Sequence, residues 1–207
     1  MSATRLLVLG AVRIFEPIHG YDLRRELMSW HADEWANISF GSIYFALKKM
    51  AADRLLEEVE TERSGGRPEK TLYRLTAQGE KEFQSLLREY FWQRKPLIDP
   101  FLVAMSQMPA MPKPELIAAL RHRATTARAT IEQLRFQAKA QLATKSDFEG
   151  EELAGRFVAE MLELSIIRLA GEADWADSLA GRIESGAFKF PDEPFPPGYA
   201  AGQLDRK

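Results

Sequence analysis

The side chains best suited to chemistry in this sequence are basic and aromatic, and they gather between residues 39 and 75. Tyr44 and Lys48 are four residues apart, so a helix would place both on one face, with Lys49 at its margin. A tyrosine hydroxyl can donate to a phosphate or contact a base edge, and lysine ammonium groups supply positive charge. On its own, such a pair is more often an ordinary exposed helix face.

A second basic group follows in the pattern of a hairpin. Gly65 and Gly66 supply a turn with free choice of backbone angles between two extended segments. Arg67 and Lys70 flank the tip, from which Arg67 would reach the sugar-phosphate backbone or a minor groove. A short basic helix followed directly by a basic-tipped hairpin is typical of a winged helix-turn-helix, whose helix lies in a major groove.

Local signals predict the helices that would hold these side chains. An apolar stripe at helical spacing predicts a recognition helix after Ser39, its expected N-cap. The stripe consists of Ile43, Leu47 and Met50. Residues 4–15 are predicted to form a core helix, residues 23–30 a second amphipathic helix, and Thr76 is expected to cap the helix after the hairpin. We therefore expect a three-helix core with a two-stranded wing.

Four short segments between residues 19 and 76 follow one another in an order and at separations that match a known sequence pattern. They are His19-Gly20-Tyr21-Asp22-Leu23, Gly41-Ser42-Ile43-Tyr44-x-Ala46-Leu47-Lys48-Lys49-Met50, Gly66-Arg67-Pro68 and Tyr73-Arg74-Leu75-Thr76. Together they resemble the pattern of the PadR family of bacterial transcriptional regulators, over roughly residues 6–87. The resemblance implies a homodimeric repressor that binds double-stranded DNA. The DNA-binding residues that follow from it and from the basic face are Ser42, Tyr44, Lys48, Lys49, Arg67 and Lys70.

Composition bounds the remaining function classes. The chain has 28 basic and 30 acidic residues, which argues against a bulk polycation but not against a local basic face. It has no cysteine and three histidines, so thiolate sites are excluded and a histidine-rich metal site is not expected. Because no catalytic or nucleotide-binding signature is present, we expect no enzyme activity, no cofactor and no metal.

No apolar run in the sequence is long enough to cross a bilayer. The apolar opening is interrupted by Arg13 and Glu16, and no small-residue cleavage site follows it. The sequence therefore predicts a soluble, cytoplasmic protein without a membrane partner.

The second half of the chain is predicted to be helical. Prolines punctuate an apolar segment that should contain a short packed helix, followed by a long helix over residues 113–145, a break at residues 148–150, a helix over 151–170 and another over 172–183. The helix over 151–170 is apolar on two faces, which favours burial of one face against a second copy of the chain. The proline-rich tail is expected to be extended or disordered.

These patterns predict a mainly α fold in three parts. Residues 1–95 form the winged helix-turn-helix, residues 96–187 a helical dimerisation and effector domain, and residues 188–207 the tail. Aromatic side chains could line a small-molecule effector site between the helical arms of a dimer, although core packing is the commoner role of such residues. The candidates are Trp92, Phe101, Phe157 and Trp175, with Met105, Met108 and Met161.

Two functional hypotheses remain at this point. The first is a sequence-specific regulator, a homodimeric repressor that binds a near-palindromic operator. The second is a winged-helix protein-interaction module whose basic face meets an acidic partner. DNA binding that prefers one sequence and weakens with salt would favour the first, and indifference to DNA would favour the second.

Overall fold

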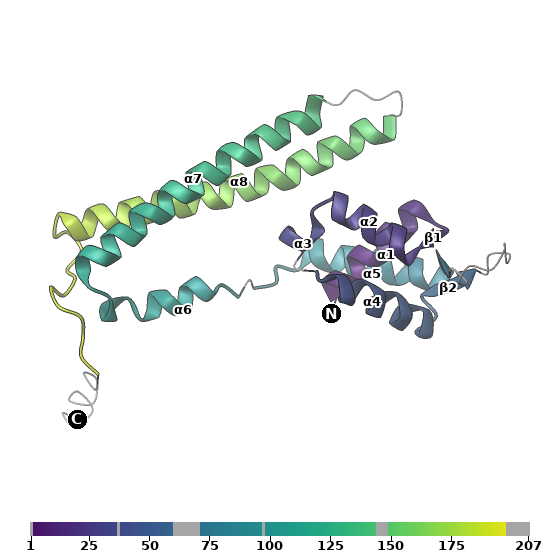
Figure 1. Ribbon diagram of the computed structural model, residues 1–207, viewed down its shortest axis with the longest axis horizontal. Coiled ribbons are helices and arrows are strands. Elements are labelled where there is room, and N and C mark those ends of the chain that lie inside the picture. Colours follow the sequence, from purple (N-terminus) through teal and green to yellow (C-terminus); the bar gives the residue numbers. More distant parts are fainter. Residues whose placement is uncertain (1, 37, 60–70, 97, 144–148, 198–207) are drawn as a thin grey trace. The chain divides into compact units, whose positions relative to one another are not determined.

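The computed structural model describes residues 2–36, 38–59, 71–96, 98–143 and 149–197. The chain divides into two compact units, residues 1–97 and 98–207, and each is described by itself (Figure 1). The fold is mainly helical with one small antiparallel sheet, as the sequence predicts. None of the described helices combines the length and hydrophobicity needed to span a membrane.

Four helices enclose the core of the first unit. They are α1 (Ser2–Phe15), α2 (Gly20–Ser29), α4 (Phe40–Ala52) and α5 (Ala77–Trp92), and the one-turn helix α3 (Ala32–Trp35) lies between α2 and α4. Val8, Leu9 and Val12 of α1 are fully buried among these helices. The central position of α1 explains why its sequence is apolar on more than one face.

A three-stranded sheet, in the order β1-β3-β2, completes the first unit. Strands β2 (Leu56–Val59) and β3 (Leu72–Leu75) pair antiparallel, with Leu56 opposite Leu75 and Val59 opposite Leu72. The short strand β1 (Ile18–His19) pairs with the other edge of β3. The sequence predicts only two strands because two residues carry no periodicity, and β1 exists through its tertiary pairing. The tip of the wing, residues 60–70, lies outside the described residues.

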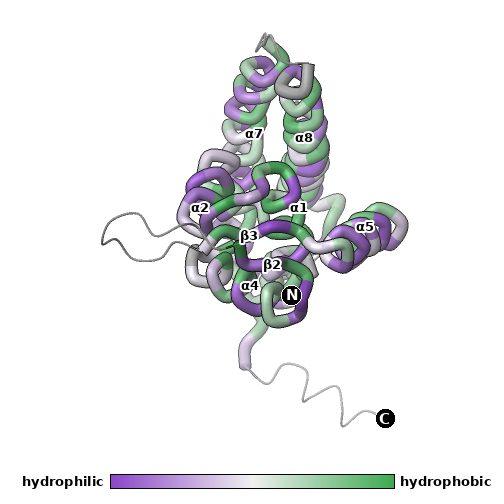
Figure 2. Tube along the Cα trace, turned by 90° about the vertical axis from the view of Figure 1, so that its right-hand side faces the viewer, coloured by the Kyte–Doolittle hydropathy of each residue, from purple (hydrophilic) through white to green (hydrophobic). Residues whose placement is uncertain are grey.

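A helical hairpin dominates the second unit. The long helices α7 (Lys113–Ala143) and α8 (Glu149–Glu184) lie side by side, preceded by α6 (Pro100–Ser106) and the 3-10 turn η1 (Met108–Ala110) (Figure 1). Ala124 of α7 and Ala173, Ala176 and Ala180 of α8 are almost fully buried. Side chains this small let the two helices approach closely. Figure 2 shows hydrophobic and hydrophilic stretches alternating along both helices, as expected when one side is buried.

The structure corrects the expected division of the last helices. The sequence predicts separate helices over residues 151–170 and 172–183, but α8 is continuous from Glu149 to Glu184. Gly171 lies within it, and a Cβ there would meet nothing within 4 Å. The helical penalty of one glycine is about 1 kcal/mol, which burial of the following alanines against α7 offsets. Glu149 and Gly150, expected in a break, are the first residues of α8, whereas Phe148 lies outside the described residues.

The start of the proline-rich tail packs onto the second unit. Gly186 ends the helical region with φ +76°, and the Phe188 amide donates to the Arg182 carbonyl at 2.8 Å. Phe188 and Phe190 then pack against the hairpin core, and the Phe195 amide donates to the Pro109 carbonyl at 2.9 Å. Residues 188–197 thus form non-helical but docked chain, while residues 198–207 lie outside the described residues.

Candidate nucleic-acid interface

Helix α4 is fixed at its first turn and along its inner face. Ser39 is its N-cap, and its hydroxyl oxygen accepts from the Ser42 amide at 3.4 Å. Ile43, Leu47 and Met50 are no more than 3% exposed, as the predicted stripe requires. Because one face of the helix is buried in the core, the opposite face is held at the surface in a fixed orientation.

That outer face carries the predicted aromatic and basic side chains. Tyr44 is 38% exposed and Phe45 67% exposed, and Lys48 and Lys49 are also exposed. We call Tyr44, Phe45, Lys48 and Lys49 the α4 outer face. Its aromatic groups stand beside its two ammonium groups, a combination that can contact both bases and phosphates.

The two lysines differ from several arginines of this unit. Arg5, Arg13 and Arg74 each form an ion pair with a carboxylate of the same unit, at 2.7 to 3.4 Å. Neither lysine of the α4 outer face has an ion pair with any described residue. Their charge is not neutralised within the described fold, so it is available to an anionic partner.

A hollow of about 380 Å³ lies beside Tyr44. Its lining residues come from the start of α2, from α4 and from around β3, and they are His19, Gly20, Tyr21, Asp22, Tyr44, Thr71 and Tyr73. The His19 imidazole is 3.2 Å from the Thr71 carbonyl, so its Nδ1–H donates there in that tautomer. Burial, aided by the nearby Glu58, raises the pKa of the Tyr73 hydroxyl, which keeps it a hydrogen-bond donor.

The hollow adds residues that the sequence analysis does not assign to the interface. Tyr21 is 66% exposed at its edge. Gly20 packs so closely that a Cβ on it would lie 3.2 Å from both Tyr44 Cε1 and Leu47 Cδ1. The signal in the sequence is Gly20 itself, because glycine is often used where the backbone approaches a neighbouring group closely.

Three predicted DNA-contact residues remain: Ser42 at the start of α4, and Arg67 and Lys70 of the wing. The Ser42 hydroxyl donates to the Ser39 carbonyl at 2.6 Å, so in this arrangement its oxygen is available as an acceptor. Arg67 and Lys70 lie outside the described residues, although strands β2 and β3, which lead to them, are described.

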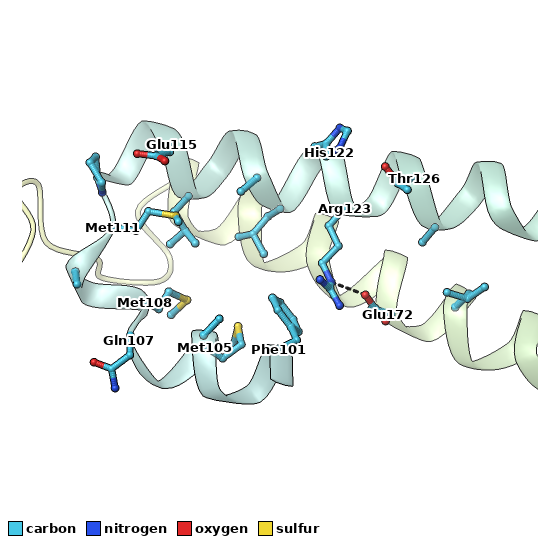
Figure 3. Close-up of a pocket in the computed structure, with 18 of the residues that line it drawn as sticks. Phe101, Met105, Gln107, Met108, Met111, Glu115, His122, Arg123, Thr126 and Glu172 are labelled. Carbon is cyan, nitrogen blue, oxygen red and sulfur yellow. Dashed lines mark ion pairs between the residues drawn. The ribbon is translucent and has the colours of Figure 1, made fainter. Parts of the chain in front are cut away.

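The candidate effector residues fall into separate places. Phe101 of α6 and Trp175 of α8 meet edge to face, with ring centroids 5.8 Å apart. Phe101 also lines a groove of about 920 Å³ in the second unit, together with Met105 and Met108 (Figure 3). Trp92 is 86% exposed at the end of α5 and Phe157 is 61% exposed on α8, and neither lines this groove.

Charged residues of the groove carry no signal in the sequence. Arg123 of α7 and Glu172 of α8 form an ion pair within it, and the Arg123 guanidinium carbon lies 3.5 Å from the Phe101 ring centroid. They are far apart in sequence and only the folded hairpin brings them together. Within the described part of the chain, no three His, Cys, Asp or Glu side chains converge on a point that could hold a metal ion.

Comparisons with known proteins agree with this geometry. Residues 8–85 match the sequence model of the transcriptional regulator PadR-like family. The structure of Bacillus subtilis PadR in complex with operator DNA superposes with a TM-score of 0.65 at 21% identity, covering 86% of this chain and 98% of that one. The PadR-like transcriptional regulator BC1756 from Bacillus cereus gives a TM-score of 0.58 at 18% identity, covering 88% and 99%.

A third structure, Bacillus subtilis PadR in complex with p-coumaric acid, gives a TM-score of 0.65 at 17% identity and covers 88% of this chain and 96% of that one. Identities this low establish a shared fold, and here the shared fold extends over both units. A search of curated proteins found no significant match. Over residues 8–85, the chain is therefore similar to the PadR-like family of transcriptional regulators.

Proposed function

We propose that this chain is a sequence-specific DNA-binding repressor that acts as a homodimer on a near-palindromic operator. The observation that carries the proposal is the α4 outer face, where Tyr44 stands beside two lysines whose charge no described carboxylate neutralises. A solved protein of the same fold was crystallised with operator DNA, which supports DNA as the partner.

In this proposal α4 enters a major groove and the wing contacts the neighbouring backbone. Lys48 and Lys49 neutralise phosphates, and Tyr44 either contacts a base edge or donates to a phosphate. Ser42 presents an acceptor to base amino groups. Arg67 and Lys70 of the wing are proposed to contact the sugar-phosphate backbone or a minor groove.

The second unit is proposed to hold two copies together. Helix α8 exposes large apolar side chains that α7 does not cover, at spacings that place them along one side of the helix. They are Leu153 (48% exposed), Phe157 (61%), Met161 (47%) and Leu164 (50%). A contiguous apolar surface of this kind favours an isologous contact with the same surface of a second copy.

Symmetry then constrains the operator. A two-fold dimer presents two copies of α4, and dimers of this class read half-sites about one DNA turn, roughly 34 Å, apart. We therefore expect a near-palindromic site, with residues 1–95 binding DNA and residues 96–187 carrying the dimer contact. Selection of bound fragments from random duplex DNA by the full chain would reveal both half-sites.

The decisive test is a DNA-binding titration at several salt concentrations with single variants. Lys48→Ala should weaken binding to all sequences similarly and reduce the slope of log affinity against log salt by about one, as loss of one phosphate contact does. Tyr44→Ala should cost about 1–3 kcal/mol on the selected site and little on random DNA, if the ring reads a base edge.

The matched control is Lys81→Ala. Lys81 is an exposed lysine of α5 that also has no ion pair with a described residue. Its removal takes away the same charge without touching the α4 outer face, so both affinity and salt slope should stay near wild type. Unchanged curves for Lys48→Ala and Tyr44→Ala would contradict the proposed surface. Indifference of the wild-type chain to DNA would favour the protein-interaction alternative.

A further inference from the structure

The second unit contains a groove with the size and lining of a small-molecule site. It lies between α6 with η1 on one side and α7 on the other, and its volume is about 920 Å³ (Figure 3). Ligand pockets in proteins commonly enclose about 300–1,000 Å³ and are lined mainly by apolar side chains. The groove lies entirely within residues 101–172, so it is complete in one copy of the chain.

The apolar wall of the groove can adapt to its contents. Met105 and Met108 line it from α6 and η1, and Met111 closes one end (Figure 3). Methionine side chains are flexible and polarizable, and they make favourable contacts with the edges of aromatic rings. Phe101 supplies a flat surface at the other end. This wall favours a planar aromatic molecule.

The charges at the centre of the groove are already matched. The Arg123 guanidinium stacks on Phe101 with its carbon 3.5 Å from the ring centroid, and its Nε faces the Glu172 carboxylate in an ion pair. A ligand carboxylate would have to compete with Glu172 for Arg123, and a ligand ammonium group would have to compete with Arg123 for Glu172. Glu115 lies on the α7 edge, away from this pair (Figure 3), and has no ion pair with a described residue; it adds to the cost of an anion and would favour a cation only at that edge.

We propose that this groove binds an uncharged planar aromatic molecule, whose ring lies between the methionines and the Arg123–Phe101 stack. A hydrogen-bond acceptor on the ring would reach the terminal amino groups of Arg123, which have no hydrogen bond with any described residue. The ligand keeps the Arg123–Glu172 pair intact and fills space that the fold leaves open.

A ligand in the groove would contact α6, the first helix of the second unit. Phe101 is held between Arg123 and Trp175, whose ring centroid is 5.8 Å away, so a ring inserted beside it acts directly on α6. Residues 93–99 connect α5 of the first unit to α6. An effector role, which rests on the proposed function, follows: the ligand changes the affinity for DNA through α6.

Three probes of similar ring size test the ligand class by calorimetric titration of the full chain near pH 7. They are 2-naphthol, which is uncharged, 2-naphthoate, which is an anion, and trimethyl(2-naphthyl)ammonium, which is a cation. We expect 2-naphthol to bind at least about tenfold more tightly than either ion, since a buried unpaired charge is costly. Equal or tighter binding of the anion or the cation would overturn the assignment.

A pair of substitutions locates the site. Ala119 is an exposed residue of α7 that lines the groove, so Ala119→Trp should fill it without disturbing the core and weaken 2-naphthol binding at least about tenfold. The control is Ala118→Trp, the same change at an exposed neighbour on α7 that does not line the groove. Equal binding by Ala119→Trp and wild type would overturn the site. Failure of 2-naphthol to bind, with a changed oligomeric state in Ala119→Trp, would instead assign the groove to a second copy.

The titrations contain no DNA, so their failure would leave the proposed function untouched. Conversely, absence of DNA binding by the unliganded chain would overturn the proposed function and leave the site standing. The effector role is then measured by titrating the selected DNA with and without 2-naphthol. We expect a several-fold change in affinity for wild type and Ala118→Trp and none for Ala119→Trp. An unchanged wild-type affinity would overturn the effector role.

Discussion

The close contact between α5 and the start of the wing is possible because Gly79 has no side chain. We therefore expect Gly79→Ala to destabilise the first unit. Gly79 is buried in the first turn of α5. An ideal Cβ on it would lie 2.0 Å from the Leu55 carbonyl oxygen and 2.9 Å from Leu75 Cδ1. The same Leu55 carbonyl accepts from the Thr76 amide at 3.1 Å, so it cannot retreat without weakening the start of α5.

These distances determine how much stability the first unit should lose. Ordinary contact begins at 3.4 Å, so the backbone must separate by about 1.4 Å at this point. Overpacking in a tight core costs about 1–3 kcal/mol, and a contact with backbone belongs at the upper end. Weakening the Thr76 hydrogen bond adds about 1 kcal/mol, while the higher helix propensity of alanine returns about 1 kcal/mol. We expect a net loss of about 2–3 kcal/mol.

Equilibrium urea unfolding, combined with hydrogen exchange of peptides from α1 and α5, would measure the loss in the first unit alone. The control is Gly171→Ala in α8, where a Cβ meets nothing within 4 Å and the second unit should gain up to about 1 kcal/mol. DNA affinity should fall with Gly79→Ala, because the wing and α4 both pack on this region. A first unit as stable as wild type in Gly79→Ala would show that a Cβ at this position does not force the Leu55 carbonyl away.

Three further predictions address the two units separately. Ile183→Ala, at a fully buried position of α8, should destabilise the second unit by about 2–5 kcal/mol in thermal or urea unfolding, and a loss below 1 kcal/mol would contradict tight packing there. Gly20→Ala should keep the fold but displace the Tyr44 ring by a few tenths of an ångström, so DNA affinity should fall several-fold while circular dichroism stays unchanged. Hydrogen bonds from Arg128 and Arg121 of α7 hold the pKa of the Asp177 carboxyl below its usual range. The contribution of Asp177 to folding stability is therefore complete above about pH 4. It is lost as the pH falls through the lower pKa of the folded state. Melting temperatures between about pH 2 and 6 should show this acid limb in wild type and less of it in Asp177→Asn.

Sequence reasoning succeeds where the determinants are local. The caps at Ser39 and Thr76 each satisfy an amide three residues onward, and both are present as predicted. The stripe of α4 is buried because its spacing alone decides which side faces the core. The exposure of Tyr44, Lys48 and Lys49 follows from the same geometry, so this face of the candidate site was predictable, whereas its role in binding stays a prediction.

Features that depend on distant parts of the chain were not predictable in this way. Strand β1 has only two residues and exists because Ile18 pairs with Tyr73. Helix α8 continues through Gly171 because packing against α7 outweighs a local preference to break. The Arg123–Glu172 pair, the neutral centre of the groove, joins two helices and leaves no pattern in either one.

The distribution of charge is compatible with the proposed DNA-binding surface on a nearly neutral chain. Several arginines of the first unit serve its own stability: Arg5 joins α1 to α5 through Glu82, and Arg13 joins the same helices through Glu80. Arginine suits this task because its planar fork orients the carboxylate. The lysines of the α4 outer face keep their charge for an external partner. Phosphate contacts carry no sequence information, so we expect discrimination between sequences to depend on Tyr44 and on the match between half-site spacing and the proposed dimer.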